Sequence, residues 1–85
     1  LEDLFEISNV VSTGEFTLSF FAIRGTVKFE LFDVMGRRLM REEWRITSNG
    51  VKTESISINN LPSGVYFLNI GQVNAWNFSR KIIKL

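Results

Sequence analysis

The sequence of 85 residues contains no cysteine and no histidine. Without a thiol or an imidazole, the chain cannot form a Ser-His or Cys-His catalytic pair, a histidine metal site or a disulfide bond. It also lacks the Asp-x-Asn/Asp run of a calcium loop, and its six glycines are isolated rather than grouped in a phosphate-binding loop. We therefore expect no enzymatic activity, no metal and no cofactor.

Carboxylates are the remaining candidates for catalysis, and their positions do not favour it. Glu42 and Glu43 are neighbours on an expected strand, so they point to opposite faces and cannot share a substrate. Asp33 precedes a glycine-containing turn and is better explained as a turn former.

Long apolar runs and strong net charge are also missing. The longest apolar run, Leu18 to Ile23, is interrupted by Ser19 and is far shorter than the roughly 20 residues of a membrane helix. The acidic start lacks the layout of a signal peptide. We therefore expect residues 1–85 to be a single domain excised from a larger exported protein. The net charge of +1 gives no field that would favour nucleic acid.

Bulky apolar side chains are abundant and recur with a period of two. Apolar residues make up 45% of the chain and include eight Phe, which is enough for one core without metals or disulfides. Alternation predicts strands over residues 4–10, 15–20, 26–31, 38–46, 51–58, 65–70 and 76–85. Seven short strands separated by turn signals predict an all-β, seven-stranded antiparallel immunoglobulin-like β-sandwich.

Turn residues suggest how these strands connect. Segments 15–20 and 26–31 are expected to pair as a hairpin, and Asn49-Gly50 predicts a second hairpin between 38–46 and 51–58. Gly36 is expected to adopt a positive φ. In the strand over 65–70, both odd and even positions carry apolar residues. We therefore expect it to be central and covered on both faces.

One tyrosine is placed for a structural role. In immunoglobulin-like sandwiches a Tyr just inside a late strand bonds its hydroxyl to the backbone of the preceding corner. Tyr66 in Leu61-Pro62-x-Gly64-x-Tyr66 has this position. No general base stands near it in the sequence, so we predict that Tyr66 pins the corner.

Three segments together resemble the type A C-terminal sorting domains of the type IX secretion system of Gram-negative bacteria. Residues 27–37 are similar to the strand of that family that runs into an Asp-x-x-Gly-Arg turn, and residues 56–70 to its Leu-Pro-x-Gly-x-Tyr signature. Residues 80–85 resemble the alternating basic and aliphatic residues that end these domains. The stretch 8–14 keeps the Asn and Gly of the family's opening motif but lacks its two prolines.

The resemblance implies a secretion address for an N-terminal passenger. The passenger would pass through the periplasm and be carried across the outer membrane to the cell surface or the medium. A sortase-like cysteine peptidase of the attachment machinery would then remove the domain. On this basis Gly36, Arg37, Lys81, Ile82, Ile83, Lys84 and Leu85 are assigned to recognition by that machinery, and Leu61, Pro62, Gly64 and Tyr66 to shaping the fold.

Other interpretations remain open. An immunoglobulin- or fibronectin-like module could bind carbohydrate or protein through Trp44 and Trp76. However, Trp44 falls on the same strand face as Met40, and Trp76 on the same face as Phe78, which favours a place in the core for both tryptophans. An interdomain spacer without a recognition role would tolerate a scrambled final segment. Open strand edges are also compatible with a weak homodimer.

Overall fold

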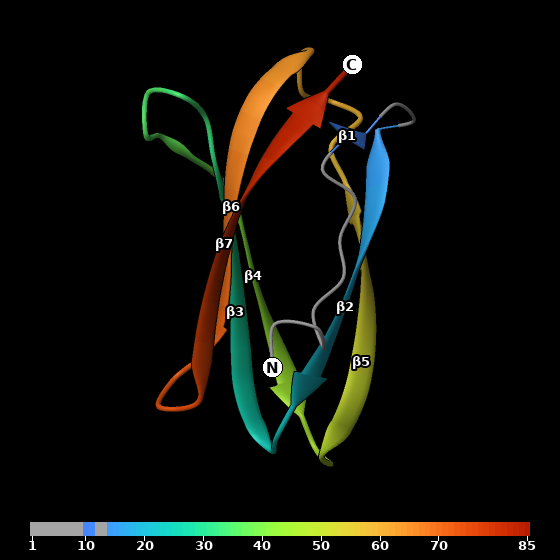
Figure 1. Ribbon diagram of the computed structural model, residues 1–85, viewed down its shortest axis with the longest axis vertical. Coiled ribbons are helices and arrows are strands. Elements are labelled where there is room, and N and C mark those ends of the chain that lie inside the picture. Colours follow the sequence, from blue (N-terminus) through green and yellow to red (C-terminus); the bar gives the residue numbers. More distant parts are fainter. Residues whose placement is uncertain (1–9, 12–13) are drawn as a thin grey trace.

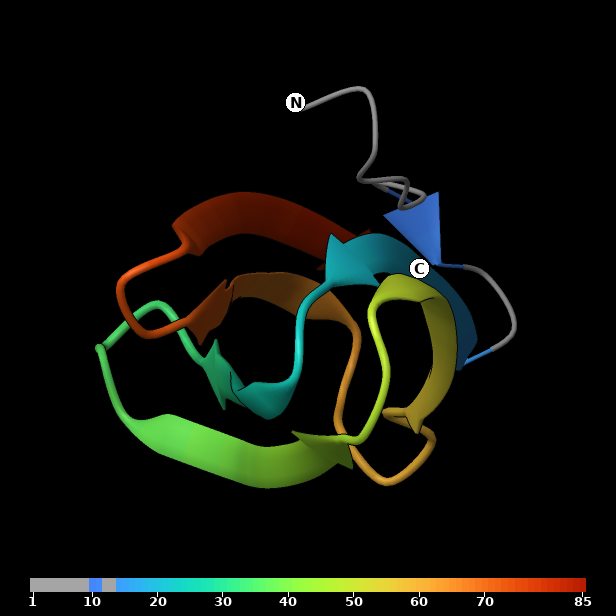
Figure 2. The same ribbon diagram turned by 90° about the horizontal axis from the view of Figure 1, so that it is seen from below.

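The computed structural model describes residues 10–11 and 14–85 as two layers of β-strands (Figure 1). The strands are β1 (Val10–Val11), β2 (Glu15–Ala22), β3 (Gly25–Phe32), β4 (Arg38–Ile46), β5 (Gly50–Ser57), β6 (Gly64–Gln72) and β7 (Trp76–Lys84). One sheet has the order β1-β7-β6-β3-β4 and curves around the second, β2-β5 (Figure 2). The all-β prediction is confirmed.

The number of strands differs from the prediction of seven antiparallel strands. The described residues form six strands of eight or nine residues, whereas β1 has two residues and pairs in parallel with β7. Apart from Val10, the strand expected over residues 4–10 lies outside the described residues. The other strand pairs are antiparallel.

Alternation correctly predicts which side chains face the core. Phe16, Leu18 and Phe20 of β2 are at most 5% exposed, while the intervening residues face outward. Phe20 lies between the layers, with its ring centroid 6.0 Å from that of Trp44 and 5.7 Å from that of Trp76. Burying each large apolar side chain contributes about 1.5–3 kcal/mol. The rest of the core is Ala22, Val27, Phe29, Leu31, Ile46, Ile56, Ile58, Tyr66, Leu68, Ile70 and Ile82.

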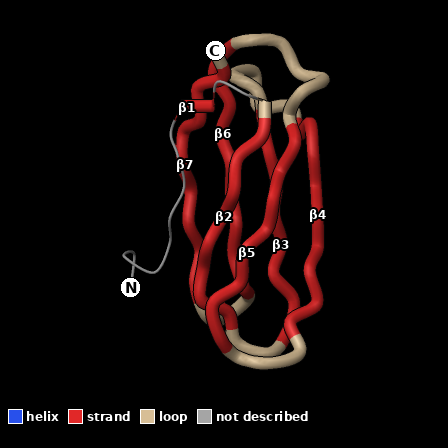
Figure 3. The backbone as a smooth tube through the Cα atoms, turned by 90° about the vertical axis from the view of Figure 1, so that its right-hand side faces the viewer, coloured by secondary structure: helices blue, strands red, loops and turns tan. Residues whose placement is uncertain are grey.

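Both predicted hairpins are wrong. β2 pairs with β5 along its whole length, and β3 lies between β4 and β6 in the other sheet (Figure 3). Each of these strands buries one face, and alternation alone cannot tell whether two such strands pair side by side or lie in opposite layers.

The two connections that would have been hairpins cross between the sheets at the same end of the molecule. Gln72 of β6 holds the first crossing: its Oε1 accepts from Ile23 N at 3.1 Å, and its Nε2 donates to Ile23 O at 2.6 Å. Asn49 joins the two crossings because its Oδ1 accepts from Arg24 N at 3.0 Å. Asn49 is thus used for a side-chain contact between loops rather than for a tight hairpin.

β6 is central, between β3 and β7, as predicted. Its outer face is not fully covered, since Phe67 is 42% exposed. β6 extends two residues beyond the predicted end at residue 70, and the turn that follows is Val73–Ala75, in which Asn74 supplies a positive φ of 63°. No helix in the described part of the chain is long and apolar enough to span a membrane.

Candidate functional site

The three segments singled out in the sequence lie at one end of the long axis. The β3–β4 turn (33–37), the β5–β6 corner (58–63) and the end of β7 are found there, opposite the connections β2–β3, β4–β5 and β6–β7 (Figure 1). Segments distant in sequence are therefore brought to the same end of the molecule.

Asp33 organises the β3–β4 turn. Its Oδ1 accepts from Met35 N at 2.9 Å and Arg37 N at 3.0 Å, and its Oδ2 accepts from Arg37 Nε at 2.8 Å. Partial burial alone would raise the pKa of Asp33, but these hydrogen bonds and the Arg37 charge together lower the pKa below its ordinary value of 3.8. Gly36 has the predicted positive φ, at 82°. The turn presents an Arg37 side chain that is 76% exposed.

Tyr66 pins the β5–β6 corner as predicted. Its hydroxyl donates to Pro62 O at 2.5 Å, and Leu61 N donates to Ile58 O at 3.1 Å within the same corner. Leu61 packs against the core while Pro62 is exposed. Gly64 opens β6 opposite Lys84. These contacts are consistent with a role of the Leu61-to-Tyr66 motif in shaping the fold.

Lys84 belongs to the same corner. Its Nζ donates to Leu61 O at 2.5 Å and lies 3.4 Å from Asn59 O. The ammonium therefore binds the carbonyl next to the one that Tyr66 binds. Sequence reasoning missed this contact, because a lysine near a chain end has no local signal that directs it to a loop 23 residues away.

The last strand divides the five predicted recognition residues between two faces. Ile82 is fully buried and Lys84 is tied to the corner, so both support the fold of the domain. Lys81 is exposed, Ile83 is half-buried and Leu85 is 65% exposed. Lys81, Ile83 and Leu85 therefore share the outward face of the strand, while Ile82 is inaccessible and the Lys84 ammonium is bound to the corner.

The outer edge of β7 is partly occupied. Val10 and Val11 of β1 pair with Ile83 and Lys84, so these residues are flanked by strands on both sides. Among the described residues, no strand pairs with the outer edge of β7 from Trp76 to Ile82. Strand addition by a receptor at the end of β7 would therefore have to displace β1.

Comparison with known families matches residues 12–85 to the secretion system C-terminal sorting domain. The chain belongs to this family. No curated protein and no solved structure matched the chain. The suspected resemblance to type IX sorting domains is thus confirmed, and the sorting domain implies an N-terminal passenger, the type IX machinery and a destination at or beyond the cell surface. The family consists of sorting signals rather than enzymes.

The tryptophans of the sorting domain lie against its core. Trp44 and Trp76 are half-buried, and Trp44 stacks with Phe20 and with Phe29, whose centroid is 5.9 Å away. These contacts agree with the placement of both residues toward the core that their parity predicted.

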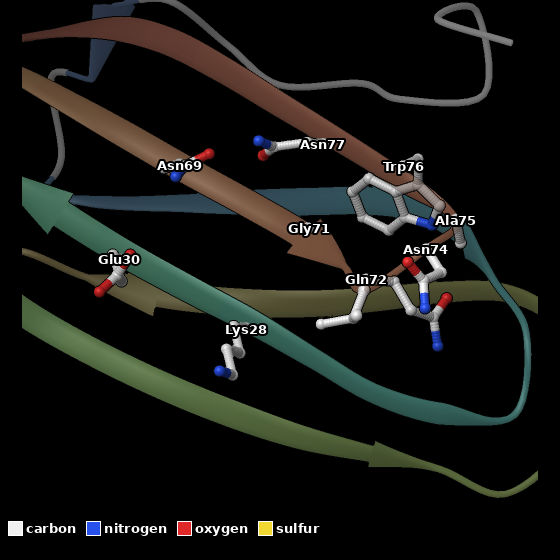
Figure 4. A pocket seen from close by; sticks show the side chains of 10 residues that line it. Lys28, Glu30, Asn69, Gly71, Gln72, Asn74, Ala75, Trp76 and Asn77 are labelled. Carbon is white, nitrogen blue, oxygen red and sulfur yellow. The ribbon is translucent and has the colours of Figure 1, made fainter.

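A shallow hollow of about 500 Å³ lies on the outer face at the opposite end of the five-stranded sheet. Figure 4 shows Lys28 and Glu30 projecting from β3, Asn77 from β7, and Gly71 on β6 between them. A side chain at Gly71 would crowd the hollow, since a Cβ there would lie 3.0 Å from Trp76 O. Within residues 10–11 and 14–85, no group of three Asp or Glu side chains could hold a metal.

Proposed function

We propose that this domain is the address by which the type IX machinery carries an attached passenger to the cell surface, and that the machinery contacts the outward half of β7 together with the Gly36-Arg37 turn. The observation that carries the proposal is the division of the last strand. Lys81, Ile83 and Leu85 face outward at the end where the turn also lies, whereas Ile82 and Lys84 are used internally.

We also propose the remaining steps of the route, which membership of the family supports. The protein is exported to the periplasm by a signal upstream of residues 1–85, which form a single sorting domain excised from a larger protein. After transport across the outer membrane, a sortase-like cysteine peptidase cleaves the domain from the passenger during surface attachment. Open outer edges of β4 and β5 within the described residues also support the prediction of a weak homodimer.

The fold is, on our proposal, immunoglobulin-like. Two features support this assignment: a β1-β7-β6-β3-β4 sheet facing the β2-β5 pair, and a Tyr66 hydroxyl bonded to the corner before its strand.

A fusion experiment tests the function. A reporter with an export signal is joined to residues 1–85 and produced in a bacterium that has a type IX system, with the same reporter lacking the domain as control. We expect the fusion at the surface or in the medium and the control in the periplasm. A C-terminal tag should be absent from the delivered reporter if the domain is cleaved. Equal delivery of fusion and control would contradict the proposal.

A further inference from the structure

A row of four side chains crosses the outer face of the five-stranded sheet near the end that holds the three motifs. The strand register places Arg38 opposite Phe32, Phe32 opposite Phe67 and Phe67 opposite Lys81. Directly opposed side chains on neighbouring strands contact one another on one face. The two phenylalanines thus lie on neighbouring strands with a basic residue on either side, and we call these four residues the aromatic row.

The aromatic row is open to solvent. Phe67 is 42% exposed and Phe32 is half-buried. A shallow hollow of about 450 Å³ lies over β3, β6 and β7 at this point, lined by Phe32, Phe67, Asn69, Ser79 and Lys81 among others. Val65 and Ile83, paired with each other in the next row, extend the apolar surface toward the end of β7. Partly exposed apolar side chains rimmed by polar groups are typical of a contact surface.

The charges at the two ends of the row differ. Arg38 Nη1 is paired with Glu30 Oε2 at 3.1 Å, so its charge is compensated within the domain. No carboxylate among the described residues pairs with Lys81. The surface therefore offers two rings and one uncompensated ammonium.

We infer that the aromatic row binds a segment of a partner protein that carries an acidic residue next to an aromatic or aliphatic one. The apolar residue would cover Phe67 and Phe32, and the carboxylate would pair with Lys81. The inference rests on the proposed function and names the chemistry of the partner, placing its contact on β3 and β6 as well as on β7.

Two other occupants fit the charges less well. A second copy would bring the same uncompensated lysine to the contact, because a twofold interface joins identical surfaces. Membrane surfaces are bound by clusters of about four to eight Lys or Arg. The hollow and the row contain three basic residues, Arg38, Arg80 and Lys81, which is fewer than such a cluster has.

The chain offers a matched control for Phe67. Phe21 on β2 is 41% exposed, on the outer face of the other sheet. The two phenylalanines differ in sheet but not in exposure. Replacing each with serine in the full-length protein therefore separates loss of a binding ring from a general effect of removing a surface phenylalanine. Melting curves of residues 1–85 with each change show whether the fold is retained.

We expect Phe67→Ser to reduce surface delivery of the passenger by about tenfold, as for a central interface residue, with delivery of Phe21→Ser unchanged. Equal delivery by the two variants would overturn the inference. Failure of the whole-domain fusion to be delivered would instead contradict the proposed function, so the two failures are distinguishable.

Photocrosslinking in cells tests the chemistry of the partner. p-Benzoylphenylalanine is placed at position 67 or, as control, at position 21 of the full-length protein. The inference expects an adduct with another protein at 67 but not at 21, through a peptide that contains Asp or Glu beside an apolar residue. Its yield should fall several-fold with Lys81→Glu. Adducts with lipid or with a second copy of the chain, or a yield independent of Lys81, would overturn it.

Discussion

Lys84 and Tyr66 bind neighbouring carbonyl groups of one corner: the Lys84 ammonium binds Leu61 O, and the Tyr66 hydroxyl binds Pro62 O, each at 2.5 Å. The two donors come from adjacent strands, β7 and β6. The corner is thus held to both strands at once, and the end of the chain contributes directly to the stability of the domain.

Lys84→Met keeps most of the side chain but removes its charge and its donors. We expect a loss of about 1 kcal/mol in the free energy of unfolding, at the low end for a charged hydrogen bond because the group is only partly buried. Lys81→Met, on the outward face, should change stability by less than about 0.5 kcal/mol. Urea unfolding of the two variants measures both values, and equal effects would contradict the role of Lys84.

Tyr66→Phe removes one hydrogen bond and leaves the ring in the core. The expected loss is about 1 kcal/mol. Because both donors hold the same corner, we also expect the double variant with Lys84→Met to deviate from additivity by about 0.5 kcal/mol or more. An unchanged unfolding curve for Tyr66→Phe would show that this hydrogen bond does not stabilise the domain.

Two glycines with nearly the same φ angle differ in the space around them. Gly14 has φ 85° and Gly36 has φ 82°, but a Cβ on Gly14 would lie 1.9 Å from Asn59 Oδ1, whereas nothing lies within 4 Å of one on Gly36. Gly36→Ala should cost about 1–2 kcal/mol from backbone strain alone. Gly14→Ala should cost more, because Asn59 must also move. Thermal unfolding that ranks them in the opposite order would contradict this packing.

The lowered pKa of Asp33 predicts a dependence of stability on pH. A carboxylate whose pKa is lower in the folded than in the unfolded chain stabilises the fold above its unfolded pKa, and this contribution is lost as the pH falls through the folded value. The loss should therefore begin near the ordinary value of 3.8 and continue below it. Unfolding midpoints measured from pH 5 to about pH 2 should fall less steeply for Asp33→Asn than for the parent chain. Parallel curves would show that Asp33 is not the group responsible.

Engineered disulfides test the sheet pairing, since the chain has no cysteine of its own. Ser19 and Thr53 are opposite each other on β2 and β5, with their hydroxyl oxygens 3.3 Å apart. The double change Ser19→Cys, Thr53→Cys should oxidise readily. Arg45→Cys with Glu54→Cys would be opposed in a hairpin at Asn49-Gly50 and should not cross-link within one molecule. If the second pair cross-linked and the first did not, the observed pairing of β2 with β5 would be contradicted and the hairpin supported.

The sequence predicted faces of strands better than partners of strands. The period of two in residues 15–20 agrees with the burial of Phe16, Leu18 and Phe20, because side-chain direction along a strand is a local property. Whether β2 pairs with β3 or β5 depends on contacts between residues 28 to 42 positions apart, and turn residues did not reveal it. Asn49 does lie in a connection between strands, but its side chain accepts a hydrogen bond from the β2–β3 connection instead of forming a tight hairpin turn.

The recognition role of the predicted site residues stays a prediction, but part of their local geometry could be predicted. The three segments lie at the same end of the molecule, and the turn and the tyrosine corner have the expected geometry. The assignment of Lys84 to the corner could not be foreseen, since it depends on where β7 ends relative to a distant loop. For the same reason, deletion of residues 81–85 is an ambiguous test of recognition: it removes the buried Ile82 and the Lys84 contact and would destabilise the domain.

The most direct test uses a charge reversal on the outward face of β7 that leaves the core intact. Lys81→Glu is compared in the full-length protein with Lys28→Glu, an exposed lysine toward the opposite end of the same sheet. Surface delivery of the passenger is measured alongside the melting temperature of each domain. We predict that both domains remain folded and that only Lys81→Glu leaves the passenger in the periplasm. Normal surface delivery of a folded Lys81→Glu protein would contradict recognition through this face.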